Sequence, residues 1–264
     1  MESPRAGFTP EQFEQYESEG VVRLPDAVPL PAVESMLAVL WRRLATRHGV
    51  ARDRPESWYV ANPAQLTAHT DEFAAMASPQ VLGVIDRLLG PGGWTPPPRW
   101  GLPLVTLPGF AERWDVPHKL WHLDLPATAT PPRVARVFLL LSALNPGGGG
   151  TGYVAGSHRV LRDLARDAGH PLRSGDARKL LTARERWFEA LFTRRAGEDR
   201  IARFMQPGGS ANGTPVRVGE MTGAAGDVYV MDPLILHGTM PNAGATPRLM
   251  LTEWIYGRDG TAPG

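Results

Sequence analysis

Short apolar runs separated by glycine and proline fill most of the chain after residue 94, and they constrain the fold more than any other feature. Short strands at close spacing, joined by frequent turns, are typical of a sandwich or a barrel. The runs with strand-like patterns cover residues 100–109, 119–126, 133–144, 151–157, 227–238 and 248–257. We therefore expect a mainly β fold.

Helical patterns come before these strands. The first begins at Thr9, where the letters TPEQ form a capping box with proline at the first helical position, and it ends at Gly20. A short strand is expected at 21–25. Apolar residues then recur with helical spacing over 31–49, and a serine, a proline and a terminal glycine bound a third helix at 78–90. The strands should therefore have flanking helices.

An Arg-rich stretch of helical pattern at about 160–205 interrupts the strands. Its large apolar side chains fall on one broad face, which needs burial. They are Leu180, Leu181, Trp187, Phe188, Leu191 and Phe192. We expect this face to act as a lid or wall of a pocket, with an interface to a second subunit as the alternative. No linker divides the chain, so residues 1–264 are expected to form one domain with this helical insertion.

Composition excludes several classes of function. A formal net charge of +1 does not suit a nucleic-acid-binding surface, which is usually strongly basic. The longest apolar stretch, 137–144, is too short to cross a bilayer, and residues 1–15 show no basic region followed by an apolar run. We expect a cytoplasmic protein without a membrane or nucleic-acid partner, and the sequence does not set its oligomeric state. Because cysteine is absent, any metal must bind to His, Asp or Glu.

The letters WHLDLP at 121–126 place a histidine and an aspartate two positions apart in an apolar run. In a strand, His122 and Asp124 would point to the same side and the apolar neighbours to the other. A metal site is one interpretation. The other is a buried histidine paired with a carboxylate, because buried polar groups need partners. A pair formed by His118 and His122 lacks the glutamate of the helical zinc-protease motif.

Residues 224–257 are read as a strand, a loop and a returning strand. His237 would end the first strand and Arg248 would begin the second, so this hairpin would bring His237, Thr239 and Arg248 to one mouth. Two histidines and one carboxylate leave three metal positions open, as in non-haem iron(II) oxygenases. Two of these positions suit a chelating 2-oxo acid and the third suits dioxygen, while a buried arginine would bind the distal carboxylate.

Four stretches together resemble the phytanoyl-CoA dioxygenase-like branch of the iron(II)/2-oxoglutarate-dependent oxygenases. A looser likeness to the opening helix and strand of that branch covers residues 8–28. The four stretches are W-H-x-D at 121–124, GGTGYVAGSHR at 149–159, GDVYVMDPLILHGT at 226–239 and the run from Asn242 to Arg248. The resemblance implies a double-stranded β-helix, which is a cupin-like jelly roll, with helices packed outside one sheet.

The same resemblance implies roles for individual residues. The iron(II) ligands, which are also the catalytic residues, would be His122, Asp124 and His237. The residues that bind the co-substrate 2-oxoglutarate would be Arg248, Thr239, Thr151 and Thr106. Dioxygen and a small molecule would be the other substrates, and hydroxylation would be the default reaction. Desaturation, ring closure and epimerisation use the same ligands and stay open.

Two other classes of function stay open on the residues alone. A zinc or manganese jelly-roll enzyme, such as a hydrolase or an isomerase, would use the same metal ligands but would not need Arg248 and Thr239 beside them. A non-catalytic small-molecule-binding protein of the same fold would be expected to have lost at least one ligand.

Overall fold

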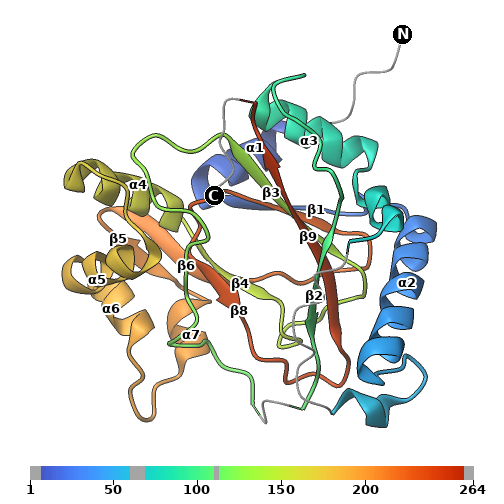
Figure 1. Ribbon diagram of the computed structural model, residues 1–264. Coiled ribbons are helices and arrows are strands. Elements are labelled where there is room, and N and C mark those ends of the chain that lie inside the picture. The colour runs from blue at the N-terminus through green and yellow to red at the C-terminus, as the bar shows by residue number, and fades with distance from the viewer. Residues whose placement is uncertain (1–6, 60–68, 110–112, 259–264) are drawn as a thin grey trace.

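Two antiparallel β-sheets face each other in the computed structural model, which describes residues 7–59, 69–109 and 113–258 (Figure 1). The larger sheet has the order β1 (Val21–Leu24), β7 (Val228–Met231), β3 (Val134–Leu140), β9 (Arg248–Tyr256) and β2 (Leu102–Thr106). The smaller has the order β5 (Gly209–Ala211), β6 (Thr214–Glu220), β4 (Thr151–Ala155) and β8 (His237–Thr239). The strand spacing predicts a sandwich or barrel, and this arrangement is the double-stranded β-helix that the family resemblance implies.

Helices cover the outer faces of both sheets (Figure 1), whereas the resemblance implied helices outside one sheet only; the difference arises because the helical insertion packs on the smaller sheet. Outside the larger sheet lie α1 (Pro10–Glu19), α2 (Leu30–His48), α3 (Pro79–Leu89) and the short 3₁₀ helices η1 (Pro55–Trp58) and η2 (Asp71–Met76). Outside the smaller sheet lie α4 (Ser157–Ala168), α5 (Ser174–Arg184), α6 (Arg186–Phe192) and α7 (Arg200–Phe204). Among the described residues, no helix is long and apolar enough to cross a membrane.

The start and stop signals read from the sequence work as predicted. The Thr9 side chain accepts a hydrogen bond from the Gln12 backbone N–H at 3.2 Å, and the Gln12 side chain accepts from the Thr9 N–H at 3.0 Å. Gly20 ends the helix with a φ of 76°, a left-handed conformation that glycine adopts without the steric cost of a β-carbon. The local signals therefore fixed the first helix.

Alternation along the strands separates three hydrophobic cores. Val137 and Leu139 of β3 pack outward against the helices of the larger sheet, whereas Phe138 and Leu140 pack inward. Leu249 and Leu251 of β9 belong to the outer core, and Met250 belongs to the inner one. A third core fills the space between the smaller sheet and α4–α7. Even-numbered residues of β3 and β9 therefore face the space between the sheets.

The apolar face of the helical stretch packs against its own chain. Leu181, Phe188 and Leu191 are buried in the third core, beside Val154 and Val218 of the smaller sheet. These two valines lie on the outer face of that sheet. The expectation of a lid is therefore wrong, and burial of this face requires no second subunit.

The hairpin expected over 224–257 is also wrong. β7 and β8 are separate strands in different sheets, because the chain turns between them at Asp232 and Pro233. Asp232 accepts a hydrogen bond from the Leu234 N–H at 2.8 Å, and a proline cannot donate to a strand ladder. β8 pairs with β4, whereas β9 pairs with β2 and β3.

Candidate metal centre

His122 and Asp124 lie on a loop, and the strand expected around them is absent from the described structure. His122 forms a single β-bridge: its N–H donates to His237 O at 2.9 Å, and its carbonyl oxygen accepts from the His237 N–H at 3.1 Å. Leu120 just before it has a φ of 71°, and the chain bends at Asp124. A one-residue pairing with β8 thus places the two histidines side by side.

The helical insertion holds this loop in place. The Leu123 N–H donates to the Ser174 hydroxyl at 3.1 Å, where α5 begins. The buried guanidinium of Arg200 donates to Val116 O at 2.7 Å and to Pro117 O at 3.2 Å. Because these bonds fix the backbone on both sides of the ligands, the insertion supports the candidate site from behind.

The three predicted ligands converge as a compact group. Asp124 lies between the two imidazoles: His122 Nε2 is 3.4 Å from its Oδ1, and His237 Nε2 is 3.1 Å from its Oδ2. One ligand atom from each residue lies within 4.8 Å of the others. Each histidine donates its Nδ1–H to a backbone carbonyl, that of Leu120 at 2.8 Å or Ile235 at 2.9 Å. The Nε2 lone pairs are therefore free to bind a metal.

Burial sets the protonation state of His237. Desolvation lowers its pKa to about 3, and the nearby charges of Arg136 and His122 act in the same direction. The imidazole is therefore neutral at physiological pH, as a metal ligand must be. The His122 side chain is 46% exposed, and that of Asp124 is 28% exposed, so the group opens to solvent on this side.

Arg248 is a buried cation without a carboxylate partner among the described residues. Its Nη1 lies 3.4 Å from the Thr151 hydroxyl and 3.9 Å from Met250 Sδ, and its Nε has no hydrogen-bond acceptor there. Burial lowers its pKa to about 10, against the opposing charge of Glu220. A buried guanidinium in this state is poorly satisfied unless an anion binds to it.

Sheet register places two of the predicted threonines, Thr106 and Thr151, beside Arg248, and places Thr239 beside Thr151. Thr106 lies opposite Arg248 in the β2–β9 pair, and Thr151 lies opposite Thr239 in the β4–β8 pair. Opposite residues of antiparallel strands share a face, so both threonines of the second pair lie on one side of the smaller sheet. Asn242 Nδ2 donates to Thr106 O at 3.1 Å and ties the loop between β8 and β9 to β2.

Sequence reasoning missed Arg136. Its guanidinium is in ion-pair contact with Asp124, and its Cζ lies 4.1 Å from the centroid of Trp254 and 4.8 Å from that of Phe138. Burial lowers its pKa to about 9. The signal was present, because Arg136 is the one charged residue in the apolar run 134–141. It has the same parity as Phe138 and Leu140, whose side chains face inward.

Comparisons with known proteins find similarity at the level of structure. No family model and no curated protein matches the sequence. The crystal structure of AviO1 from Streptomyces viridochromogenes Tue57 is 18% identical, with a TM-score of 0.56 over 96% of this chain and 97% of that chain. SnoK, a non-haem α-ketoglutarate-dependent carbocyclase from nogalamycin biosynthesis, is 14% identical. Its TM-score is 0.54 over 96% of this chain and 86% of that chain.

HygX from Streptomyces hygroscopicus, with nickel and 2-oxoglutarate bound, is 17% identical to this chain. Its TM-score is 0.51 over 96% of this chain and 88% of that chain. These likenesses establish the fold, which is shared with non-haem 2-oxoglutarate-dependent enzymes.

Proposed function

We propose that this chain is a single-domain iron(II)- and 2-oxoglutarate-dependent dioxygenase that acts on a small molecule. One observation carries the proposal: a His-Asp-His group faces the same space between the sheets as Arg248, a buried arginine with no acid partner in the described part of the chain. The fold that the chain shares with HygX, a structure with nickel and 2-oxoglutarate bound, supports the proposal.

The donor set fits the proposed metal. His122, Asp124 and His237 offer two neutral imidazole nitrogens and one carboxylate, the facial set of non-haem iron(II) enzymes, and leave room for further ligands. Arg248 would bind the distal carboxylate of 2-oxoglutarate, and the Thr239 hydroxyl, with Thr151 and Thr106 nearby, would add neutral hydrogen bonds.

When bound, iron(II), 2-oxoglutarate and dioxygen together supply the oxidising power to convert a substrate C–H bond to C–OH, with succinate and carbon dioxide as co-products. The protein's own contribution is positional. Nδ1–H bonds to backbone carbonyls orient both imidazoles, and the Leu123–Ser174 bond fixes the loop that carries Asp124. We propose hydroxylation as the outcome, although SnoK, described as a carbocyclase, shows that this fold also serves ring closure.

The deciding experiment is an anaerobic titration. Iron(II) followed by 2-oxoglutarate should produce a weak visible metal-to-ligand charge-transfer band. His122→Ala, Asp124→Ala and His237→Ala should each abolish the band, whereas His170→Ala, a control at an exposed histidine, should retain it. Metal binding without a band would favour a metal-dependent hydrolase or isomerase. Absence of metal binding would favour a non-catalytic binding protein.

A further inference from the structure

A second buried arginine faces the metal ligands from the larger sheet. Arg136 is 8% exposed and contacts Asp124, the only carboxylate within ion-pair distance of it among the described residues. Its Nε has no hydrogen-bond acceptor there. A guanidinium carries five N–H donors, so Asp124 alone cannot satisfy it. Arg136 therefore has donors to offer a further acceptor.

Two aromatic rings hold this guanidinium in position. Phe138, on the same strand, and Trp254, opposite Arg136 in the β3–β9 pair, both lie within cation–π distance of its Cζ. Stacking fixes the plane of the guanidinium and hence the directions of its donors. A fixed, planar donor set suits recognition of a carboxylate or another planar acid.

Asp124, the carboxylate that contacts Arg136, would also be a ligand of the proposed metal. An iron dication, the Asp124 carboxylate, the two carboxylates of 2-oxoglutarate and the Arg248 guanidinium sum to zero formal charge. Arg136 then adds one positive charge. Glu220 accepts from the backbone N–H groups of Gly147 and Gly150, and Glu253 accepts from those of Gly101 and Trp254. In the described structure neither carboxylate lies within ion-pair distance of Arg136. An anionic substrate would give Arg136 a second direct counterion besides Asp124.

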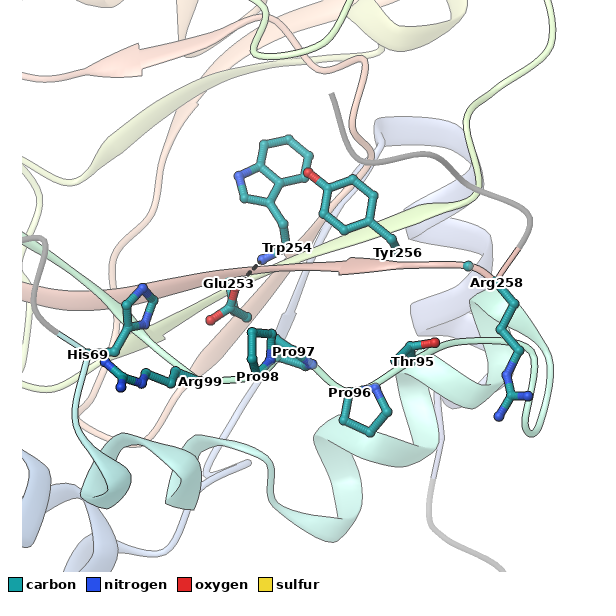
Figure 2. A pocket seen from close by; sticks show the side chains of 11 residues that line it. His69, Thr95, Pro96, Pro97, Pro98, Arg99, Glu253, Trp254, Tyr256 and Arg258 are labelled. Atoms are coloured by element: carbon teal, nitrogen blue, oxygen red, sulfur yellow. Dashed lines mark hydrogen bonds between the residues drawn. The ribbon is translucent and has the colours of Figure 1, made fainter. Parts of the chain in front are cut away.

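An aromatic surface continues from Arg136 towards a cavity. The rings of Trp254 and Tyr256 lie 6.4 Å apart at an interplanar angle of 20°, and Figure 2 shows both rising from the same side of β9. Both residues line a cavity of about 640 Å³ together with Pro96, Pro97 and Pro98, which Figure 2 shows on the other side of β9 from the two rings. This volume is within the usual range for small-molecule sites, and two nearly parallel rings suit a flat ring system.

We propose that the primary substrate is an anionic, ring-bearing small molecule whose acid group binds Arg136 and whose ring lies against Trp254 and Tyr256. Arg136 is then a specificity-determining residue. For the reaction, the inference rests on the proposed function. For the substrate class, it rests on Arg136, Trp254 and Tyr256. It places the acid beside Asp124, and therefore places the neighbouring carbon atoms of the substrate near the metal.

The test uses three matched probes: 2-naphthoate, 2-naphthalenemethanol and 2-naphthylmethylamine. Their dissociation constants are measured by ligand-observed NMR on the metal-free protein and on the anaerobic protein saturated with iron(II) and 2-oxoglutarate. The wild type should bind the acid roughly ten-fold or more tightly than the alcohol, as expected for a charge-assisted hydrogen bond, and should bind the amine most weakly. Arg136→Gln should remove the preference, whereas Arg166→Gln, on the exposed face of α4, should preserve it. Trp254→Leu should raise the dissociation constants of the acid and the alcohol by similar factors.

Two results would overturn the inference. One is an acid-to-alcohol ratio that Arg136→Gln leaves unchanged. The other is a loss of iron or 2-oxoglutarate binding in Arg136→Gln without any probe, which would make Arg136 a support for Asp124. The probe ratio in the metal-free protein does not depend on the charge-transfer band. If the wild type showed no charge-transfer band, only the proposed function would be refuted. If the wild type showed no preference for the acid over the alcohol, only the proposed substrate class would be refuted.

Discussion

At the scale of single residues, the buried arginines Arg200 and Arg248 have contrasting surroundings. Arg200 is buried, but backbone carbonyls including Val116 O and Leu191 O accept from its guanidinium, and Glu198 pairs with it at 3.2 Å. Arg248 has a hydroxyl and a thioether as neighbours instead. The first arrangement is complete and stabilises the fold, whereas the second needs an anion.

Arg248→Lys keeps the charge but loses the planar pair of donors. If Arg248 binds 2-oxoglutarate, losing one charge-assisted hydrogen bond should cost about 1.5–3 kcal/mol of binding free energy, or roughly a ten- to hundred-fold rise in Kd. Thr239→Val should act in the same direction and more weakly. Anaerobic calorimetry should show unchanged iron(II) affinity in both variants. Equal 2-oxoglutarate affinity in wild type and Arg248→Lys would make Arg248 an ordinary strand residue.

At the scale of elements, the site depends on how the ligand-bearing loop is held. The loop has one β-bridge to β8, so its position relies on side-chain bonds from the helices. We expect Ser174→Ala to remove the acceptor of the Leu123 N–H and to weaken metal binding by about 1 kcal/mol, roughly five-fold. Thr182→Ala is the control, because that hydroxyl bonds within α5 to Arg178 O. Identical metal affinities in the two variants would show that the insertion does not position the loop.

The junction of α1, α4 and the loop before β8 offers a test of packing. Gly20 and Gly49 both end helices with positive φ, 76° and 69°. A β-carbon at Gly20 would lie 2.5 Å from His158 Nδ1 and 2.6 Å from Ile235 Cδ1, whereas one at Gly49 would meet no described residue within 4 Å. Gly49→Ala should therefore cost about 1 kcal/mol of unfolding free energy, the conformational penalty alone. Gly20→Ala should cost about 3 kcal/mol, because overpacking adds to that penalty. Denaturant unfolding measures the unfolding free energy of each variant. Equal losses in the two variants would contradict the close packing of Gly20 against His158 and Ile235.

At the scale of the whole molecule, buried neutral histidines link stability to pH. Burial lowers the pKa of His158, whose Nε2 lies 3.3 Å from Glu17 O, and lowers that of His237 more strongly. The unfolded chain therefore takes up protons first as pH falls below about 6.5. Stability is full above that pH and decreases below it, by up to about 1.4 kcal/mol per pH unit for each such histidine.

The measurement is the unfolding free energy of metal-free protein between pH 7.5 and 5. His158→Gln should reduce the slope, and His170→Gln, at an exposed position, should leave it unchanged. A flat profile in the wild type would show that these histidines are not held neutral.

The sequence by itself determined the fold class, the capped helix α1 and the identity of the residues that converge. Alternation, capping boxes and turn residues act over a few positions, so their physical basis is visible in the letters. The pairing of His122 with Asp124 also needed only local spacing. The loop that carries these ligands was nevertheless misread as a strand, because its apolar residues pack into the third core from an irregular backbone.

Only the tertiary structure decided how the distant parts meet. The chain turns at Asp232 and Pro233, so β8 and β9 enter opposite sheets, and Arg248 approaches Thr151 across the space between them. Pairing of β3 with β9 sets Arg136 opposite Trp254 within the larger sheet, and the loop that carries Asp124 brings this carboxylate to Arg136. Contacts between sheets depend on which strands pair and in which register, and local propensity carries no information about pairing between positions a hundred residues apart.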